Sequence, residues 1–357
     1  MLQILRRKLA PVYENMFSFW PGGWSPFPSN VVFELLYACN LACPFCYLRV
    51  EEKVKKIKAQ RHLLTGEILR TIDQIPSQTG ISFTGGEIML RKDIIEVLAH
   101  AKKRHRVGII SNLTMNTPEK NQSLVAMGLD TLMFSLDGYT PALHDKVRGK
   151  GSWGKTIATV KAIQEQKKRQ NKVYPTFTIN SVVLPHNYTK MSKMVELAAK
   201  FKVNWLNFQL LDPSVDRSGY ELHDDLTHLK TDYRKLMPKL PRQALKSNLD
   251  KSLKLAKKFN LRVTFSPKLE VHDVLDYYGG KIDLSRVYCT KIFHLSRISP
   301  FGDVYPCFNL KIGSVLDQPF MKLWNNYTYR HFRQQIKRGA FKAACVGCCH
   351  LRLVPKN

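Results

Sequence analysis

The sequence is poor in acidic residues and has no long apolar run. It contains 28 Asp and Glu against 56 Lys and Arg, so its formal net charge at pH 7 is +28. No segment approaches the roughly 18 consecutive apolar residues of a membrane-spanning helix. The first residues, MLQILRRK, lack the apolar core of a signal peptide. The sequence therefore predicts a cytoplasmic protein, and in that reducing compartment its eight cysteines are expected to bind metal rather than form disulfides.

The positive charge is spread along the chain. Clusters occur at 53–61, 102–106 and 167–169, with more through 229–258, mostly on predicted helices, where a solvent-exposed face is the default interpretation. Such an excess favours anionic partners: phosphorylated substrates, acidic peptides, nucleic acid or an anionic membrane surface. No recognisable nucleic-acid-binding motif accompanies it.

Three cysteines, Cys39, Cys43 and Cys46, follow the apolar run VVFELLY at 31–37 with the spacing CxxxCxxC. Three closely spaced thiolates at the end of a strand can hold three irons of a four-iron cluster and leave the fourth iron open to a small molecule. Zinc is the alternative, but zinc sites usually combine two CxxC pairs or add histidines. No histidine lies within ten residues of this triplet. The triplet therefore favours an iron–sulfur cluster that takes part in chemistry.

Short β-rich runs alternate with amphipathic segments from residue 31 to about 210. The predicted strands lie at 31–37, 80–84, 106–111, 131–136, 176–184 and 205–210, and the predicted helices near 65–75, 92–104, 118–127, 153–168 and 188–201. This alternation indicates a parallel sheet built from βα units, either doubly wound or a partial barrel. The remaining regions are predicted to be an aromatic and basic N-terminal extension at 1–30, a helical connection at 211–265, and a small loop-rich C-terminal domain at 266–357.

The second predicted strand ends in Gly85-Gly86-Glu87. Paired glycines allow the backbone to approach a ligand closely. Active sites of parallel β/α folds gather at the carboxyl ends of the strands. An ordinary turn explains the three residues equally well when they are taken alone.

Short polar side chains also end the next two strands. Ser111 and Asn112 follow the third strand, and Ser135 and Asp137 follow the fourth. They fit a ligand-binding rim, although turn formation alone accounts for them. Farther along, Arg148 can bind a carboxylate through two hydrogen bonds or serve as a surface ion-pair partner.

A second group of cysteines lies near the C-terminus. Cys289 and Cys307 frame a CX₁₂GX₄C pattern, and Cys345 and Cys348 form a CxxC that is followed by Cys349. Four thiolates from two loops can fill every protein site of a four-iron cluster or hold zinc. The spacing alone does not separate these two metals.

Taken together, these motifs resemble the radical S-adenosylmethionine (radical SAM) superfamily, whose signature has an aromatic residue at the position of Phe45. The Gly-Gly-Glu motif is similar to the one that receives the methionine amino group of SAM. The C-terminal cysteines resemble the SPASM/Twitch extension, in the shorter form with one auxiliary cluster, because only Cys349 is left over. The resemblance spans about 31–350. It implies a partial (β/α)6 TIM-like barrel with a small loop-rich C-terminal Twitch/SPASM-type domain.

The resemblance also implies an activity and a set of ligands. A [4Fe-4S] cluster on Cys39, Cys43 and Cys46 would bind SAM, and one electron from a flavodoxin or ferredoxin would split SAM into methionine and a 5′-deoxyadenosyl radical that abstracts hydrogen from a substrate. One auxiliary [4Fe-4S] cluster is implied on Cys289, Cys307, Cys345 and Cys348, and Cys349 is either left without iron or exchanges with Cys348 as the ligand. The implied SAM contacts are Phe45, Gly85, Gly86, Glu87, Ser111, Asn112, Ser135, Asp137 and Arg148.

Three substrate classes compete. An anionic small molecule that is oxidised or rearranged is favoured, since the cysteine spacing resembles a Twitch-type dehydrogenase acting on 2-deoxy-scyllo-inosamine. A peptide is the alternative. About thirty residues before the barrel leave no room for a leader-binding domain, and Phe308 stands where sulfatase maturases have an aspartate base. The third class, a metal-cluster scaffold that binds nucleic acid, requires the motif matches to be accidental.

The sequence assigns no proton acceptor. Asp212, His223, His272 and Asp273 lie in segments that could border the substrate cavity. Each residue type is found more often as a surface or capping group.

Overall fold

The structure is a computed structural model that describes residues 20–46, 48, 61–212, 232–307 and 310–355. Most of the predicted extension at 1–30, most of the basic cluster at 53–61, His223 and Phe308 lie outside these residues. In the described part of the chain, no helix is both long enough and apolar enough to cross a membrane.

Seven parallel strands form a continuous wall in the order of the sequence. They are β1 (Asn30–Glu34), β2 (Gly80–Thr84), β3 (Val107–Ser111), β4 (Thr131–Ser135), β5 (Thr176–Val183), β6 (Trp205–Leu210) and β7 (Arg262–Ser266). The register pairs Asn30 with Gly80 and Thr131 with Thr176, so the carboxyl ends of the strands lie at one edge. Parallel neighbours need a crossover of a dozen or more residues, and helices supply it here.

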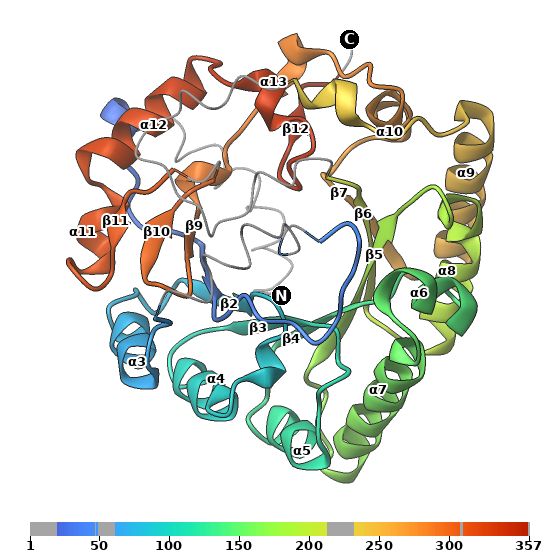
Figure 1. Ribbon diagram of the computed structural model, residues 1–357, viewed down its shortest axis with the longest axis horizontal. Helices are drawn as coiled ribbons and strands as arrows, with labels where there is room; N and C mark the ends of the chain where they lie inside the picture. The colour runs from blue at the N-terminus through green and yellow to red at the C-terminus, as the bar shows by residue number, and fades with distance from the viewer. Residues whose placement is uncertain (1–19, 47, 49–60, 213–231, 308–309, 356–357) are drawn as a thin grey trace.

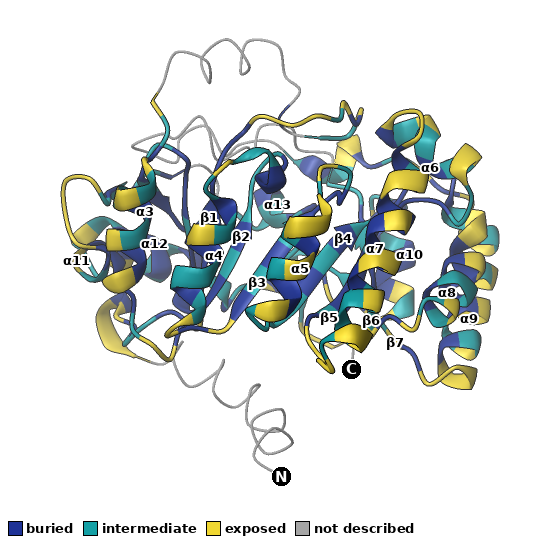
Figure 2. Cartoon of the chain, turned by 90° about the horizontal axis from the view of Figure 1, so that it is seen from below, coloured by how far each residue is buried: buried dark blue, intermediate teal, exposed yellow. Residues whose placement is uncertain are grey.

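The crossover helices pack on the outside of this wall (Figure 1). They are α3 (Thr65–Asp73), α4 (Ile94–Lys102), α5 (Pro118–Ala126), α6 (Pro141–Arg148), α7 (Ser152–Arg169), α8 (Met191–Lys200) and α9 (Arg242–Lys258). Figure 2 shows that their outward faces are exposed and that the strands beneath them are largely buried. The start of α5 shows how local residues define a helix end. Pro118 occupies the first turn, and the Thr117 hydroxyl caps the helix by accepting a hydrogen bond from Lys120 N (3.3 Å).

Alternate residues of each strand serve two different purposes. Apolar side chains such as Phe33, Phe83 and Phe134 point toward the helices and are almost fully buried. The intervening positions, including Glu34, Ser82 and Asn180, line a central cavity. Because successive side chains in a strand point to opposite faces, this alternation creates a hydrophobic layer outside the wall and an interior in which polar side chains are interspersed with apolar ones such as Val32, Ile110 and Met133.

The C-terminal region extends the same sheet. Strand β9 (Leu295–Ile298) pairs in parallel with β1, and β10 (Asp303–Tyr305) and β11 (Gly313–Ser314) follow it in antiparallel order. A separate two-stranded ribbon joins β8 (Val287–Tyr288) to β12 (Arg352–Leu353). The helices of this region are α10 (Val271–Tyr278), α11 (Phe320–Trp324), α12 (Tyr327–Lys337) and α13 (Lys342–Cys345).

The predicted fold class is confirmed, and the sheet continues beyond the six predicted strands. Strand β7 lies at the end of the stretch 211–265, which the sequence pattern assigns to a helical connection, and β9 joins the other side of β1. β7 has a weak signal because it is five residues long and begins with the exposed Arg262. β9 is only four residues long and pairs with a partner about 265 positions away, which no local pattern reveals.

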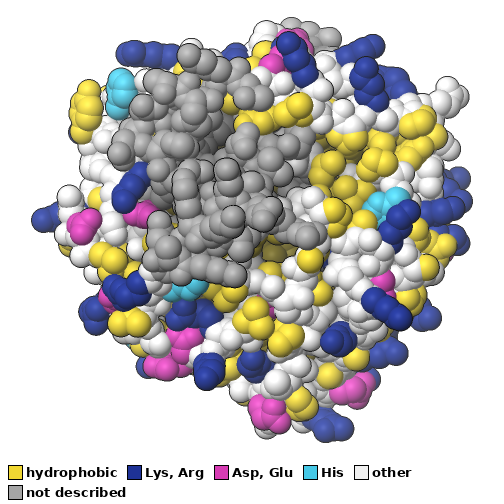
Figure 3. Space-filling view, in the orientation of Figure 1, with side chains coloured by type: hydrophobic (Ala, Val, Ile, Leu, Met, Phe, Trp, Pro, Cys, Tyr) yellow, Lys and Arg dark blue, Asp and Glu magenta, His cyan; other side chains and the backbone are white. Residues whose placement is uncertain are grey.

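Lys and Arg side chains are scattered around the rim of the face shown in Figure 3. They lie over several different elements and are not gathered over one of them. Neighbouring acidic groups offset some of these charges, as in the exposed pairs Lys193–Glu196 and Lys246–Asp250. The arrangement agrees with the distributed charge of the sequence.

Candidate active site

The cysteine triplet lies on the loop that follows β1, and the Gly-Gly motif after β2 packs directly against this loop. Gly86 N donates to Leu36 O (2.7 Å), and Glu87 N donates to Ala38 O (2.9 Å). A Cβ on Gly86 would lie 2.0 Å from Ala38 O, and one on Gly85, whose φ is +141°, would lie 2.2 Å from Leu36 O. The glycines are therefore required by the close contact between the two loops, whatever ligand lies beside them.

Glu87 joins this contact to the next strand. Its carboxylate is fully buried and accepts hydrogen bonds from Asn112 N (2.7 Å), Ser111 Oγ (2.7 Å) and Met89 N (3.0 Å). Burial raises the pKa of Glu87, and these donors oppose that shift. The Asn112 side chain in turn reaches Cys39 Sγ (3.9 Å). Three of the predicted SAM contacts thus form one network that ends at the first cysteine.

A buried ion pair supports the second cysteine. Arg148 Nε donates to the Asp137 carboxylate, and its Nη1 lies 3.9 Å from Cys43 Sγ. The guanidinium also sits 5.4 Å from the centre of the Phe45 ring. Val182 N donates to the other Asp137 oxygen (2.7 Å). Burial acts to lower the pKa of Arg148, but the Asp137 carboxylate and the nearby sulfurs outweigh burial, so the pKa is raised.

His144, which the sequence did not single out, completes this support. Its Nδ1 accepts a hydrogen bond from Asp137 N (3.1 Å), so the ring is held as the neutral tautomer with its proton on Nε2. Burial lowers the pKa of His144 to about 4. Ser135, the remaining predicted contact, ends β4 opposite Asn180 of β5.

The small ribbon brings two of the C-terminal cysteine segments together, while Cys307 follows β10 of the main sheet. Cys289 directly follows β8, while Cys348 and Cys349 precede β12, and pairing of Tyr288 with Arg352 fixes the two ends side by side. Cys348 N donates to Cys345 O (3.1 Å), which closes the CxxC into a turn. Burial raises the pKa of the Cys289 thiol to about 11, so a metal must displace its proton to bind there.

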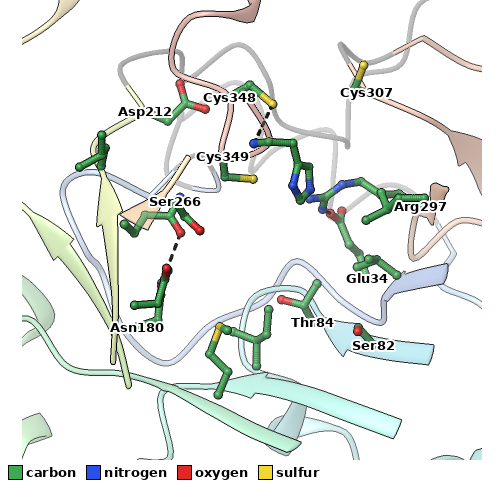
Figure 4. Close-up of a pocket in the computed structure, with 18 of the residues that line it drawn as sticks. Glu34, Ser82, Thr84, Asn180, Asp212, Ser266, Arg297, Cys307, Cys348 and Cys349 are labelled. Atoms are coloured by element: carbon green, nitrogen blue, oxygen red, sulfur yellow. Dashed lines mark hydrogen bonds and ion pairs between the residues drawn. The ribbon is translucent and has the colours of Figure 1, made fainter. Parts of the chain in front are cut away.

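One cavity of about 540 Å³ lies between the N-terminal cysteine loop and the C-terminal cysteines. Phe45, from the N-terminal cysteine loop, lines it. Cys307, Cys348 and Cys349, labelled in Figure 4, line it from the C-terminal region. The wall between them carries an unusual number of polar side chains: Asn30, Glu34, Ser82, Thr84, Asn180, Asn207, Gln209, Asp212, Ser266, Arg297 and His350.

The charged groups in the cavity wall are arranged as a buried pair and an acid at the rim. Arg297 Nη1 donates to Glu34 Oε1 (2.8 Å), and Tyr37 donates from its hydroxyl to Glu34 Oε2 (2.7 Å). Asp212 follows β6 and lines the cavity, as Figure 4 shows. Asp273 is committed elsewhere, to Arg286 (2.7 Å).

The outcome for the four suggested proton acceptors is therefore mixed. Asp212 faces the cavity. His272 is partly exposed beside Asp273 (3.2 Å), and Asp273 pairs with Arg286, away from the residues that line the cavity. His223 lies outside the described residues.

The donor chemistry fits iron–sulfur clusters, because both groups offer thiols, the usual ligands of such clusters. Among the described residues, no three His, Cys, Asp or Glu side chains converge closely enough for one metal ion. Cys39, Cys43 and Cys46 provide three thiols on one loop, and Arg148 supplies a positive charge beside them.

Sequence reasoning missed most of the cavity wall. His350 follows the last cysteine, and its backbone N donates to Cys348 Sγ (3.4 Å). The amides of Asn180, Asn207 and Gln209 occupy alternate positions of β5 and β6. A polar residue at every second position of a buried parallel strand is the signal that could have revealed them, because such strands usually read as continuous apolar runs.

Comparison with known proteins agrees with this geometry. The profile of the radical SAM superfamily matches residues 33–198, and that of the SPASM iron–sulfur cluster-binding domain matches residues 289–349. The chain is 25% identical over 334 residues to the AdoMet-dependent heme synthase of Methanosarcina barkeri, an alignment that covers 90% of this chain and 91% of that protein. It is 25% identical over 317 residues to the PqqA peptide cyclase of Xanthomonas axonopodis pv. citri, with 85% and 75% covered.

A solved structure shares the fold. SuiB of Streptococcus suis, bound to its precursor peptide SuiA, superposes with a TM-score of 0.63 at 17% identity. The match covers 93% of this chain and 71% of that one. At this level of identity the likeness concerns the fold alone.

Proposed function

Because this chain belongs to the radical SAM superfamily and carries a C-terminal SPASM iron–sulfur domain, we propose that it modifies a peptide. The enzyme uses a [4Fe-4S] cluster with SAM and an auxiliary cluster. When bound, the first cluster together with SAM supplies a 5′-deoxyadenosyl radical that removes a hydrogen atom from the substrate. The relatives favour the peptide alternative over the anionic small molecule that the sequence favours, since one of them is a peptide cyclase.

The observation that carries the proposal is the chemistry of the cavity wall. Asn180, Asn207 and Gln209 line one side of a space of about 540 Å³. Each carboxamide both donates and accepts hydrogen bonds, as each peptide unit does. Asn207 Nδ2 donates to Asn180 Oδ1 (2.6 Å), so the amides already form a row that a backbone can join. In SuiB the same fold accommodates a precursor peptide.

The cysteine loop and its supports set the position of the reaction. We propose that Cys39, Cys43 and Cys46 hold the SAM-binding cluster, and that Gly85 and Gly86 border the site of the methionine end of SAM. The ion pair of Arg148 with Asp137 holds the guanidinium beside Cys43, where it offsets the negative charge of ligated sulfur. Cys289, Cys307, Cys345 and Cys348 are the proposed ligands of the auxiliary cluster across the cavity.

Asp212 is the proposed proton acceptor. It faces the cavity from the end of β6, so it can take a proton from a substrate position whose hydrogen atom has been removed from the other side. The auxiliary cluster, held by the C-terminal cysteines, would accept the one electron that remains on the substrate. The proposal that a flavodoxin or ferredoxin delivers the electron rests on the sequence resemblance alone.

The experiment uses anaerobically reconstituted enzyme with dithionite, SAM and pools of synthetic peptides of about ten residues. We expect peptides to stimulate formation of 5′-deoxyadenosine and to change in mass, for example by loss of two hydrogens. Gln209→Leu should reduce this stimulation and leave the slow, substrate-free cleavage of SAM unchanged. Lys258→Gln, on the outer helix α9, is the matched control. Stimulation by sugar phosphates but by no peptide would contradict the proposal.

A haem-forming reaction is the second candidate. It is favoured by the likeness to the AdoMet-dependent heme synthase, which this chain matches over 91% of that protein's length. Incubation of the same enzyme with iron-containing tetrapyrroles, followed by mass spectrometry for haem, separates the two candidates. Haem formation together with no peptide turnover would select the second.

A further inference from the structure

A second pocket, of about 420 Å³, lies outside the barrel cavity and shares no lining residue with it. It is formed between the turn η1 (Pro21–Gly23) and the C-terminal half of α12, with Phe293 at its side. Phe293 lies two residues before β9, and the residue between them, His294, accepts hydrogen bonds through its carbonyl oxygen from Ser29 N and Asn30 N. The pocket therefore lies at the amino ends of the strands, away from the cysteine loop that follows the carboxyl end of β1.

The pocket contains a buried cation with an unused donor. Arg333 is fully buried. Its Nε donates to Ile292 O (3.0 Å), and its Nη1 donates to Gly23 O (3.1 Å) and to Asn325 Oδ1 (2.9 Å). Its Nη2 has no hydrogen-bond partner among the described residues. A buried donor without a partner is costly, and here that donor belongs to a group that lines an open pocket.

Among the residues that the structure describes, no carboxylate balances this charge. Arg333 forms no ion pair with a described residue, and residues 318–357 contain eight Lys and Arg but no Asp or Glu. Burial lowers the pKa of Arg333 to about 10, so the side chain is still charged at neutral pH. The rings of Trp324 and Tyr329 lie 4.0 Å from its guanidinium carbon and stabilise the cation in part.

A structural role explains only some of these features. The contacts of Nε and Nη1 fasten η1 and the short turn η8 (Lys291–Phe293) to α12, which accounts for burying an arginine here. They do not account for the free Nη2, nor for Lys337 and Arg338, which line the same pocket. Trp20 adds a half-exposed aromatic ring to the lining, and its ring centre lies 4.9 Å from that of Trp24, with the two planes tilted by 57°.

We propose that this pocket binds a small organic anion. A carboxylate or phosphate group is attracted by the buried charge of Arg333 in the pocket wall and by Lys337 and Arg338, which line the same pocket. The apolar part of the ligand rests on Trp20 and Phe293. The site is separate from the proposed function, and neither depends on the other, because the two cavities have no residue in common.

The test measures binding of four probes to the anaerobically reconstituted full-length enzyme by ligand-observed NMR and calorimetry. The probes are inorganic phosphate, hexanoate, hexyl phosphate and, as the uncharged control, hexanol. We expect both organic anions to bind at one site and hexanol not to bind. If only hexyl phosphate binds, the ligand class is a phosphate ester; if only hexanoate binds, it is a carboxylate. Binding of hexanol as tightly as hexanoate would overturn the proposal.

Variants assign the binding to this pocket. Lys337→Gln and Arg338→Gln should each lower the affinity for the organic anions about fivefold, as expected for loss of one partly exposed charge. Trp20→Ala should lower the affinity for hexyl phosphate more than the affinity for inorganic phosphate. Lys322→Gln, an exposed change on α11, is the matched control. Because Arg333→Met removes structural contacts as well, it is used only if the variant melts cooperatively. Unchanged binding in Lys337→Gln and Arg338→Gln, or equal weakening by Lys322→Gln, would refute the site.

Discussion

Replacing Gly86 with alanine should dislodge the N-terminal cysteine loop. The new Cβ would lie 2.0 Å from Ala38 O, 2.6 Å from Ala38 C and 3.1 Å from Cys39 N. The loop must therefore retreat by more than an ångström, which breaks the hydrogen bonds from Gly86 N to Leu36 O and from Glu87 N to Ala38 O. Two backbone hydrogen bonds contribute about 2 kcal/mol, and overpacking costs about 1–3 kcal/mol. The free energy of unfolding should therefore fall by about 3–5 kcal/mol. The structural change should be largest in the loop residues up to and including Cys39.

The assay compares iron content, SAM cleavage and denaturant unfolding of the anaerobic wild-type and variant proteins. Gly108→Ala is the matched control, because a Cβ at this position in β3 meets its nearest neighbours, Ser82 Oγ and Thr131, at 3.8 Å. Gly86→Ala should lose the iron of the N-terminal cluster and most SAM cleavage, while Gly108→Ala should retain both. Wild-type iron content and SAM cleavage in Gly86→Ala would refute the reasoning that close contact between the loops holds the cysteines.

Three further substitutions test the supports of the site. Arg148→Gln leaves the fully buried Asp137 carboxylate without its cation, so denaturant unfolding should show a loss of about 3–5 kcal/mol; an unchanged unfolding free energy would contradict the ion pair. Glu87→Gln turns an amide donor toward a backbone N–H donor, so the free energy of unfolding should fall by about 1–3 kcal/mol in the same measurement. An unchanged free energy of unfolding would show that the carboxylate is not buried in this network. Burial holds the pKa of His144 at about 4, below its unfolded value of 6.5, so the unfolded chain binds more protons and up to about 3 kcal/mol of stability is lost as the pH falls from 6.5 to 4. His144→Asn keeps an acceptor for Asp137 N and should remove this part of the pH dependence; identical stability profiles for the two proteins would show that His144 does not titrate in this way.

Local signals predicted the fold class and the position of the site. The CxxxCxxC spacing and the Gly-Gly-Glu motif each lie within a few consecutive residues, so the sequence alone reveals them. The alternation of strands and helices indicates the parallel sheet. The cysteine loop and the Gly-Gly-Glu loop lie at one edge of the wall because each directly follows a strand and parallel strands end on the same side.

Features that depend on which face a residue takes, or on distant pairing, were not predicted. Glu87 resembles a ligand-binding residue in sequence, yet its carboxylate is bound by Ser111 and Asn112. The cavity amides become visible only when the inward face of each strand is known. The pocket at Arg333 joins residues more than 300 positions apart, as in the bond from Arg333 Nη1 to Gly23 O. No window of sequence contains such a contact.

The central claim is that Cys39, Cys43 and Cys46 hold the cluster that cleaves SAM, while the C-terminal cysteines hold a separate cluster across one cavity. The most direct measurement is iron content together with 5′-deoxyadenosine and methionine formation in anaerobic wild type, Cys43→Ala and Cys307→Ala. The account predicts about eight irons in the wild type, loss of all SAM cleavage in Cys43→Ala, and continued substrate-free cleavage with about half the iron in Cys307→Ala. Full SAM cleavage by Cys43→Ala, or zinc in place of iron in the wild type, would contradict it.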